Sequence, residues 1–225
     1  MEISVESVER AVAAERGGAS RIELCGALEV GGVTPSAELM RETRACVWAP
    51  IFAMVRPRGG NFVYSAAEFE EMKRSIEAAR AAGMDGVVLG LLHVHGSVDV
   101  ARTTELVRAA APLPVTFHRA FDESADLYAA LEDVVATGAS RLLTSGGEAT
   151  APKAVARIAE LVRRARGRVV VMPGSGITAG NAAEMAAATG AEEIHAGLSS
   201  VVAGDAVEEE FEMEVRRLVG SVATI

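Results

Sequence analysis

One pattern returns four times along the chain and constrains its fold more than any other feature. In each copy an amphipathic stretch ends at a Gly, and a short apolar run follows. The copies are RGGASRIELC at 16–25, AAGMDGVVLG at 81–90, ATGASRLLTSGG at 136–147 and ATGAEEIHAG at 188–197. Because Gly adopts the left-handed backbone conformation that ends many helices, each copy predicts a helix followed directly by a strand.

Further strands and helices fill the segments between these copies. The additional strands are expected in MEISV at 1–5, PIFAMV at 50–55, LPVTFH at 113–118 and RVVVMP at 168–173. The helices include those expected at 66–82, 99–110, 126–137, 151–166 and 179–188. The eighth and last helix of the chain is expected at 206–222. Strict alternation of strand and helix indicates parallel strands, and eight such units predict an α/β fold, a (β/α)8 TIM barrel formed by 1–225 as a single domain.

An open doubly wound sheet is the alternative to a closed barrel. Such a sheet often carries a Gly-x-Gly-x-x-Gly turn after an early strand, where it binds a dinucleotide. The segment CGALEVGG at 25–32 does not have this spacing. The barrel is therefore favoured.

Composition limits the partners and the location of the protein. Half of the 225 residues are hydrophobic, which is enough for a large core, and the net charge of −9 argues against nucleic acid and anionic membranes as partners. No run of about 18 apolar residues and no secretory signal is found, so a cytoplasmic protein is predicted. Cys25 and Cys46 match no disulfide or zinc pattern and are expected to be reduced thiols.

The alternation of side chains along the strands turns ionisable residues toward the barrel interior. Successive side chains of a strand point to opposite faces, so one set packs on the helices and the other fills the interior. In RIELC, Ile22 and Leu24 are expected to face the helices, which leaves Glu23 and Cys25 inward. The same rule turns six more residues inward: Glu2, Ser4, Thr116, His118, Glu193 and His195. Because charged groups are rarely buried without partners, this interior predicts a polar pocket.

The ends of the strands supply the candidate site residues. In TIM barrels the active site is built from the C-terminal ends of the strands and the loops that follow them. The catalytic candidates at these ends are Glu23, Arg56, His118 and Asp122. The ligand-binding candidates there are Arg58, Arg119, Thr144, Ser145 and His195. A single buried His is more often only hydrogen-bonded to its neighbours, but several strands with such residues favour a pocket.

Glycine-rich turns follow the last three predicted strands. TSGGEATAP spans 144–152, PGSGIT spans 173–178 and AGLSS spans 196–200. Backbone N–H groups in such turns can bind an anion, and the loops after strands seven and eight of barrels often hold phosphate. These turns add five ligand-binding candidates: Gly146, Gly147, Gly174, Ser175 and Gly176. The alternative is that the glycines serve only to form tight turns.

The segment RPRGGNFVYS at 56–65 is a second feature suited to an anion. Arg56 and Arg58 could bind a carboxylate or a phosphate through forked pairs of hydrogen bonds. The alternative is structural, with an Arg at the barrel mouth paired to Glu23 or Asp122. The sequence leaves both interpretations open.

Seven motifs, taken in order, give the chain a close resemblance to a known family. They are RIELC, TPS, RPRGGNFVYS, PLPVTFHRAFD, LTSGG, VMPGSGIT and HA. With these motifs the chain resembles the CutC family, named for copper homeostasis, from about residue 2 to about residue 197. The resemblance implies a cytosolic TIM-type barrel that is usually a homodimer.

The resemblance also implies where copper would bind. Family members proposed to bind copper carry a Cys in a Glu-Val-Cys-Val stretch of the first strand, beside the Cys of RIELC. Here the stretch reads EISV, so Ser4 takes the first position and Cys25 alone keeps the second. Cu(I) prefers thiolate and thioether ligands, and a single thiol makes a poor site. Cu(I) at Cys25 is therefore disfavoured, and no other cofactor is evident.

The segment LHVHGSVD at 92–99 departs from the Thr-Pro-x-Gly type of loop usual in the family. His93 and His95 lie two residues apart and could place two imidazoles on one side of a strand extension, as a metal site requires. No third ligand is near in the sequence, so an exposed loop is favoured.

Two functions from different classes fit these observations. The first is an enzyme that acts on a small anionic metabolite, phosphorylated or carboxylated, by proton abstraction beside a carbonyl, as an isomerase or lyase does. His118 or Glu23 would be the base, and Arg56 would stabilise the developing charge. A Schiff-base aldolase is disfavoured because Lys73 and Lys153 fall in predicted helices. The alternative is a Cu(I)-binding copper homeostasis protein without turnover, and interior ion pairs with a purely structural role are a third possibility.

Overall fold

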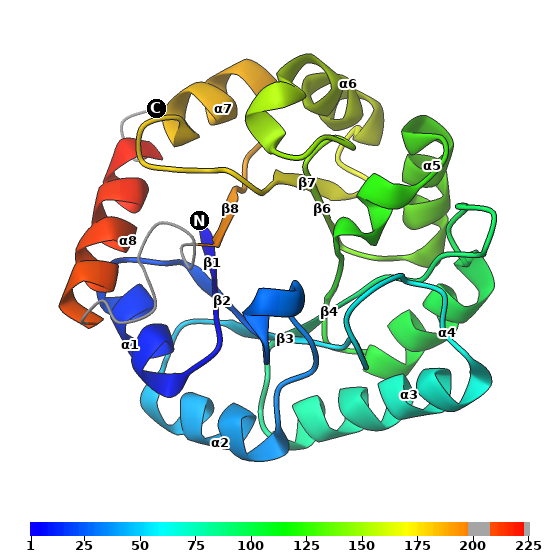
Figure 1. Ribbon diagram of the computed structural model, residues 1–225, viewed down its shortest axis with the longest axis horizontal. Coiled ribbons are helices and arrows are strands. Elements are labelled where there is room, and N and C mark those ends of the chain that lie inside the picture. The colour runs from blue at the N-terminus through cyan, green and yellow to red at the C-terminus, as the bar shows by residue number, and fades with distance from the viewer. Residues whose placement is uncertain (198–207, 223–225) are drawn as a thin grey trace.

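Strands and helices alternate around a ring in the computed structural model, which describes residues 1–197 and 208–222 (Figure 1). The parallel strands form the inner wall: β1 (Glu2–Val5), β2 (Arg21–Leu24), β3 (Ile51–Met54), β4 (Gly86–Leu89), β5 (Val115–Phe117), β6 (Arg141–Thr144), β7 (Val170–Pro173) and β8 (His195–Gly197). The helices form the outer ring: α1 (Val8–Arg16), α2 (Ala37–Cys46), α3 (Ala66–Ala81), α4 (Val100–Ala110), α5 (Leu127–Thr137), α6 (Val155–Ala165), α7 (Ala182–Thr189) and α8 (Glu208–Val222). The predicted TIM barrel is confirmed, and the open doubly wound sheet is not the fold.

The strands follow one another around the barrel in chain order. The sheet runs β7-β6-β5-β4-β3-β2-β1-β8, so its two ends are β7 and β8, which lie side by side in the ring (Figure 1). Gly174, directly after β7, allows this approach. A Cβ atom at this position would lie 2.5 Å from Leu143 Cδ1 and 3.3 Å from His195 Cβ. The absence of a side chain at Gly174 thus lets the end of β7 reach the first residue of β8.

The predicted two-residue alternation separates two apolar regions. The main core lies between strands and helices and includes Ile3, Ile22 and Leu24, as predicted. A smaller cluster inside the barrel is formed by Cys25, Phe52, Met54 and Val88, with Leu28 packed against it. Burial of apolar side chains between the strands and the surrounding helices therefore stabilises the barrel. The smaller apolar cluster inside leaves room in the interior for polar groups.

Ionic groups fill the N-terminal end of the barrel. Arg21 Nε lies 2.5 Å from Glu2 Oε2, and Arg21 also pairs with Glu193, which in turn pairs with Arg141. Both guanidinium groups lie over the ring of Phe52. Because this end is filled, the cavity described below opens at the other end of the strands.

The helix boundaries differ from the predicted ones at α6 and α7. The predicted helix at 151–166 is a short 3-10 turn, Ala151–Lys153, followed by α6 from Val155. Pro152 suits the first turn of a helix but removes a backbone donor, and Ala154 breaks the helical geometry between the two pieces. Likewise α7 begins at Ala182 and not at 179, because Asn181 precedes it with its side chain bonded to the turn before. Within the described residues, no helix combines the length and the apolar character needed to cross a membrane.

Candidate active site

A cavity of about 380 Å³ opens at the C-terminal end of the barrel. Many of the predicted site residues line it: Glu23, Arg56, His118, Arg119, Asp122, Ser175, Gly176 and His195. Ser4, Leu28, Met54, Phe62 and Glu123 are also part of the wall. The other predicted residues do not line the cavity: Cys25, Arg58, Thr144, Ser145, Gly146, Gly147 and Gly174. The barrel therefore brings ionisable groups from β2 and β8, and from the segments that follow β3 and β5, to one small space.

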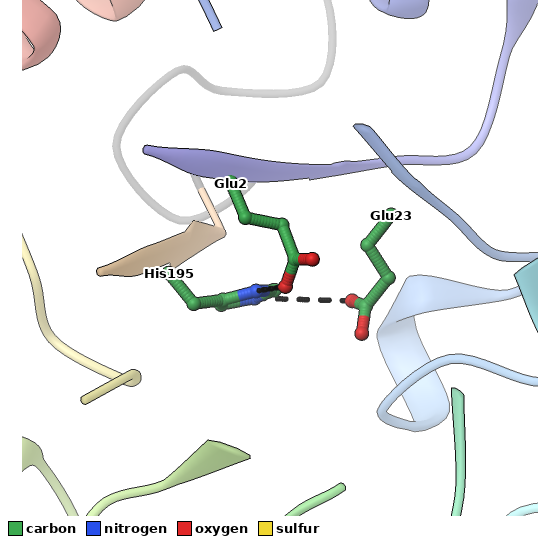
Figure 2. A group of neighbouring side chains, drawn as sticks. All are labelled: Glu2, Glu23 and His195. Carbon is green, nitrogen blue, oxygen red and sulfur yellow. Dashed lines mark hydrogen bonds and ion pairs between the residues drawn. The ribbon is translucent and has the colours of Figure 1, made fainter. Parts of the chain in front are cut away.

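Two carboxylates flank the imidazole of His195 (Figure 2). His195 Nδ1 lies 2.7 Å from Glu2 Oε1, and His195 Nε2 lies 3.8 Å from Glu23 Oε2. Glu2 Oε2 accepts a further hydrogen bond from Arg21. Glu23 Oε1, in contrast, is buried and has no hydrogen-bond partner among the described residues. Both carboxylate oxygens of Glu2 are thus hydrogen-bonded, one to His195 and one to Arg21. Glu23, which lines the cavity, has one oxygen that is not hydrogen-bonded to any described residue.

These contacts give the two carboxyl groups opposite properties. Burial alone would raise the pKa of Glu2, but the hydrogen bond and charge of His195 and the charge of Arg21 outweigh it and lower the pKa to about 2. Burial raises the pKa of Glu23 to about 7, opposed by the charge of His195 and assisted by that of Glu2. For His195, burial acts to lower the pKa, but the charge of Glu23 and the hydrogen bond to Glu2 raise it. Glu23 can therefore gain or lose a proton near neutral pH.

Glu2, Glu23 and His195 also carry ligand atoms of the kind that hold metal ions. These atoms lie within 4.8 Å of one another. The two oxygens of Glu2, however, already bind His195 Nδ1 and Arg21 Nε. Glu23 and His195 Nε2 then remain, which is fewer than the three or more protein ligands typical of a zinc site. We interpret the group as an acid–base cluster.

His118 lies in the cavity wall with one ring nitrogen fixed. Its Nδ1 accepts a hydrogen bond of 3.1 Å from the backbone N–H of Ala120, while its buried Nε2 has no partner in 1–197 or 208–222. The ring packs against Phe62 and Phe117. Burial, together with the nearby charge of Arg56, lowers the pKa of His118 to about 3. The imidazole is therefore neutral at physiological pH.

Arg56 is a buried cation in the cavity wall. Its guanidinium N–H groups donate to three loop carbonyls, those of Val30, Gly32 and Gly60, and the group lies over the ring of Phe62. Arg56 Nε is buried without a partner. The structure gives Arg56 no carboxylate partner within the described part of the chain. Pairing with Glu23 or Asp122, the structural alternative considered above, is not present.

Arg58 lies outside the cavity. Its Nε donates to Glu68 at 2.6 Å, and its other donors bind the carbonyls of Gly59, Asn61 and Val63. The two arginines therefore do not form one forked anion site. Arg58 shapes the loop, and of the two arginines of this segment only Arg56 brings positive charge to the cavity wall.

Asp122 occupies the anion cradle predicted in the TSGG turn. The carboxylate of Asp122 accepts hydrogen bonds from Thr144 Oγ1 (2.5 Å), Ser145 N (2.9 Å), Ser145 Oγ (2.9 Å) and Gly147 N (3.1 Å), and from Arg119 Nε (2.9 Å). Gly146 N donates to Thr144 Oγ1. The turn thus binds an anion, as its sequence suggested, but the anion is the protein's own side chain. Asp122 connects the loop after β5 to the end of β6.

The turn after β7 contributes two residues, Ser175 and Gly176, to the cavity wall. Ser175 and Gly176 both have a left-handed backbone, with φ of 77° and 70°. For Ser175 this conformation is unfavourable by roughly 1 kcal/mol. Their N–H groups face no hydrogen-bond acceptor in 1–197 or 208–222, and both residues line the cavity. The predicted AGLSS turn at 196–200 falls partly outside the described residues, since 198–200 are not among them.

Comparison with known proteins identifies the family. The model of the CutC family matches residues 1–200. The chain belongs to the CutC family. A CutC family protein of Chromobacterium violaceum is 49% identical over 203 residues, covering 90% of this chain and 82% of the relative. A Homo sapiens relative named copper homeostasis protein cutC homolog is 47% identical over 200 residues, covering 89% and 73%. A crystal structure of a CutC protein from Streptococcus agalactiae has a TM-score of 0.83 at 32% identity, covering 87% and 96%.

The residues of this CutC chain do not fit a Cu(I) site at Cys25. The thiol is fully buried, and its Sγ lies 3.7 Å from Glu23 Oε2 as a donor. Burial and the charge of Glu23 raise the pKa of Cys25 well above its usual value, so the thiolate that copper prefers is disfavoured. Ser4, on the neighbouring strand, offers a hydroxyl where a second thiol would be needed. Met54 packs beside Cys25 and adds only a thioether.

His93 and His95 lie on a loop away from the barrel cavity. Their rings stack with centroids 5.2 Å apart and an interplanar angle of 7°. His93 Nδ1 lies 3.8 Å from Asp99 Oδ2, and His95 Nε2 lies 2.9 Å from Ser97 Oγ. Stacked rings do not converge on one ion, so the structure agrees with the favoured exposed loop.

Sequence reasoning missed two residues of the site. Glu2 was recognised as inward but was not assigned a role, and Arg21 was not considered. The signal available for both was their position: each is a charged residue on the inward face of a strand, opposite the other in the β1–β2 register. Glu2 also lies opposite His195 in the β1–β8 register, which is set by barrel closure.

Proposed function

We propose that this CutC protein binds a small anionic metabolite in the cavity and exchanges a proton with it through Glu23. The observation that carries the proposal is Arg56. Arg56 is 5% exposed and lines the cavity, and its guanidinium has no carboxylate partner in the described part of the chain. A buried charge without a counter-charge is costly, and an anionic ligand would supply that counter-charge.

Neutral donors around the cavity support the same interpretation. The N–H groups of Ser175 and Gly176 and the Nε2–H of His118 are free of protein acceptors in the described residues. Such groups bind the oxygens of phosphate or carboxylate without adding charge. A cavity of about 380 Å³ has the volume of a small-molecule site.

Glu23 is the group suited to proton transfer. Its pKa of about 7 allows it to act as base or acid near neutral pH, and its Oε1 is free. Asp122 is not suited to this role, because its oxygens are occupied by the TSGG turn and Arg119. His118, neutral and with Nδ1 occupied, is not suited to be the base either. Of the candidates suggested by the sequence, the geometry therefore favours Glu23.

A thermal-shift experiment with matched arginine variants tests the anion site. Wild type, Arg56→Gln and Arg58→Gln are melted with and without inorganic phosphate, glycerol 3-phosphate and citrate. A ligand that binds the folded state raises Tm by mass action. We expect at least one of these anions to raise Tm of wild type and Arg58→Gln and to have no effect on Arg56→Gln. Equal shifts in all three proteins, or none in wild type, would overturn the proposal.

Copper handling by this chain, its homodimer and its cytoplasmic location stay predictions from the family resemblance. The human relative is named for copper homeostasis. In this chain the described soft donors near the cavity are Cys25 and Met54. The proposed reaction at Glu23 acts on an anionic metabolite and does not require this chain to bind copper tightly.

A further inference from the structure

We infer that His118 donates a hydrogen bond to a carbonyl oxygen of the ligand, and that the substrates are enolisable aldehydes or ketones that carry a phosphate or carboxylate. This inference rests on the proposed function and names the substrate class of the same site. It replaces the sequence-based role of His118 as a base by the role of an electrophile.

The contacts of His118 determine which nitrogen carries the proton. Nδ1 accepts the N–H of Ala120 at 3.1 Å, so Nδ1 holds a lone pair and not a hydrogen. In a neutral imidazole the single N–H is then on Nε2. Nε2 is buried and has no acceptor within the described residues. A buried donor without an acceptor is unfavourable in the free protein, and a ligand oxygen would satisfy it.

Packing holds the ring in this orientation. A Cβ atom on Gly90 would lie 2.6 Å from His118 Nδ1, so the ring fits only because residue 90 is a glycine. The ring centroid of Phe62 is 4.9 Å away, and Phe117 packs at the edge with a centroid distance of 6.2 Å. Rotation of the ring would also break the bond to Ala120. The Nε2–H group is thus preorganised before a ligand arrives.

The charge of the surroundings keeps the imidazole neutral. Burial disfavours the imidazolium, and the guanidinium of Arg56 adds repulsion of the same sign. The ring also lacks a free lone pair for a proton from a carbon atom, because Nε2 carries the hydrogen and Nδ1 accepts from Ala120. A neutral N–H can, however, bind an oxygen on which negative charge develops, and Arg56 supplies the positive field for that charge.

The reaction balances with groups present in the cavity. The carboxylate of Glu23 removes a proton from the carbon next to the carbonyl. The C–H electron pair becomes the new C=C bond, and the C=O π pair moves to the oxygen, which His118 Nε2–H and the Arg56 field stabilise. Return of the proton from Glu23 to the same carbon regenerates the substrate. In an α-hydroxy-carbonyl compound, the hydroxyl proton passes to the former carbonyl oxygen, and return of the Glu23 proton to the former carbonyl carbon then moves the carbonyl. No oxidant, reductant or second substrate is needed.

Ligand-free NMR tests the tautomer directly. Protein labelled with ¹⁵N at histidine reports for each ring which nitrogen is protonated. We expect His118 to be the neutral Nε2–H form across the neutral pH range, assigned by its loss in His118→Gln. A protonated ring, or the Nδ1–H form, would overturn the inference without bearing on anion binding by Arg56.

Matched ligands test the substrate class. Glycerol 3-phosphate has no carbonyl, whereas phosphoglycolohydroxamate has the same anionic group and mimics an enediolate. We expect wild type to bind the hydroxamate about tenfold or more tightly than glycerol 3-phosphate, and His118→Gln to lose about tenfold of that preference. His93→Gln, the same change on the exposed loop, serves as the control and should keep the wild-type preference.

The outcomes separate the two proposals. If glycerol 3-phosphate binds and the hydroxamate binds no better, the anion site stands and the carbonyl inference fails. If neither binds wild type, the carbonyl inference fails, and the anion site fails with it when inorganic phosphate and citrate do not raise Tm of wild type either. The Nε2 proton of His118 should also move downfield when the hydroxamate binds, which a purely structural histidine would not show.

Discussion

Glu2 Oε1 and His195 Nδ1 lie 2.7 Å apart, although 193 positions separate the two residues in the chain. The contact joins β1 to β8, so it forms only when the first strand meets the last one and the sheet closes on that side. It also fixes the imidazole with Nδ1 toward Glu2 and Nε2 toward Glu23 (Figure 2). One hydrogen bond thus links closure of the barrel to the geometry of the cavity.

Replacing Glu2 by Gln should lower the pKa of His195 and the stability of the protein. The raised pKa of His195 contributes stability that is fully present below the ordinary value of 6.5 and is lost as pH rises through the raised value. Without the Glu2 charge this stabilisation should be lost at lower pH than in wild type. Below pH 6.5 the free energy of unfolding of Glu2→Gln should be smaller than that of wild type by on the order of 2 kcal/mol. Histidine NMR titration and urea unfolding measure both effects. The signals of His93 should be the same in both proteins, and an unchanged His195 titration would refute the assigned contact.

Replacing Glu23 by Gln should stabilise the protein at alkaline pH. The pKa of Glu23 is raised from 4.5 to about 7, so its contribution is fully present below 4.5 and is lost as pH rises through about 7. Above this range wild type bears a buried carboxylate that the variant lacks. We expect the stability of Glu23→Gln relative to wild type to improve between about pH 5 and about pH 8 by on the order of 2 kcal/mol. Glu123→Gln, at an exposed position of the same mouth, should show no such change in its urea unfolding curves.

Replacing Asp122 by Asn should loosen the turn after β6. The carboxylate accepts from Thr144, Ser145, Gly147 and Arg119, and an amide cannot replace all of these acceptor contacts. We expect a loss on the order of 3 kcal/mol in the free energy of unfolding and faster hydrogen exchange at the Ser145 and Gly147 amides. The same substitution at Asp133 on α5, for which the structure gives no hydrogen bond of the side chain, is the control. If both variants lose equal stability, Asp122 does not hold the turn.

Copper binding should depend on residue 4. Wild type offers one buried thiol with a raised pKa, so we expect it not to remove Cu(I) from the chelator bicinchoninate under anaerobic conditions. Ser4→Cys should add a second soft ligand near Cys25 and compete with the chelator, and Ser4→Cys with Cys25→Ser should lose this ability again. Competition by wild type that disappears in Cys25→Ser would show instead that a single thiol is sufficient.

The alternating fold was predictable because its signals are local. A Gly that ends a helix, as at Gly83, Gly138 and Gly190, and the two-residue period of the strands are both properties of short segments. They predicted the barrel and the inward direction of Glu23. The exposed loop at His93 was favoured on other grounds, because no third metal ligand lies near it in the sequence. The boundaries of α6 were less predictable, because the 3-10 turn before it depends on how that loop packs on the barrel.

Hydrogen-bond partners and protonation states were decided by the tertiary structure. The carboxylate of Asp122 occupies the TSGG turn that was predicted to bind a ligand anion. Arg56 donates to loop carbonyls, whereas the sequence suggested that it would bind a ligand anion or pair with a carboxylate of the protein. His118 has the sequence of a possible base, yet burial and the charge of Arg56 keep it neutral. Burial raises the pKa of Glu23 to about 7, which the sequence alone does not indicate.

The sequence by itself therefore determined the order of strands and helices, the family and the set of polar residues directed inward. The tertiary structure alone decided which of them meet, as Glu2 and His195 do. It also decided which atoms have no partner in the part of the chain that the structure describes, as is the case for Glu23 Oε1 and His118 Nε2. The physical reason is that secondary structure follows from neighbours along the chain. The pKa of a buried group follows from desolvation and from charges brought close by folding.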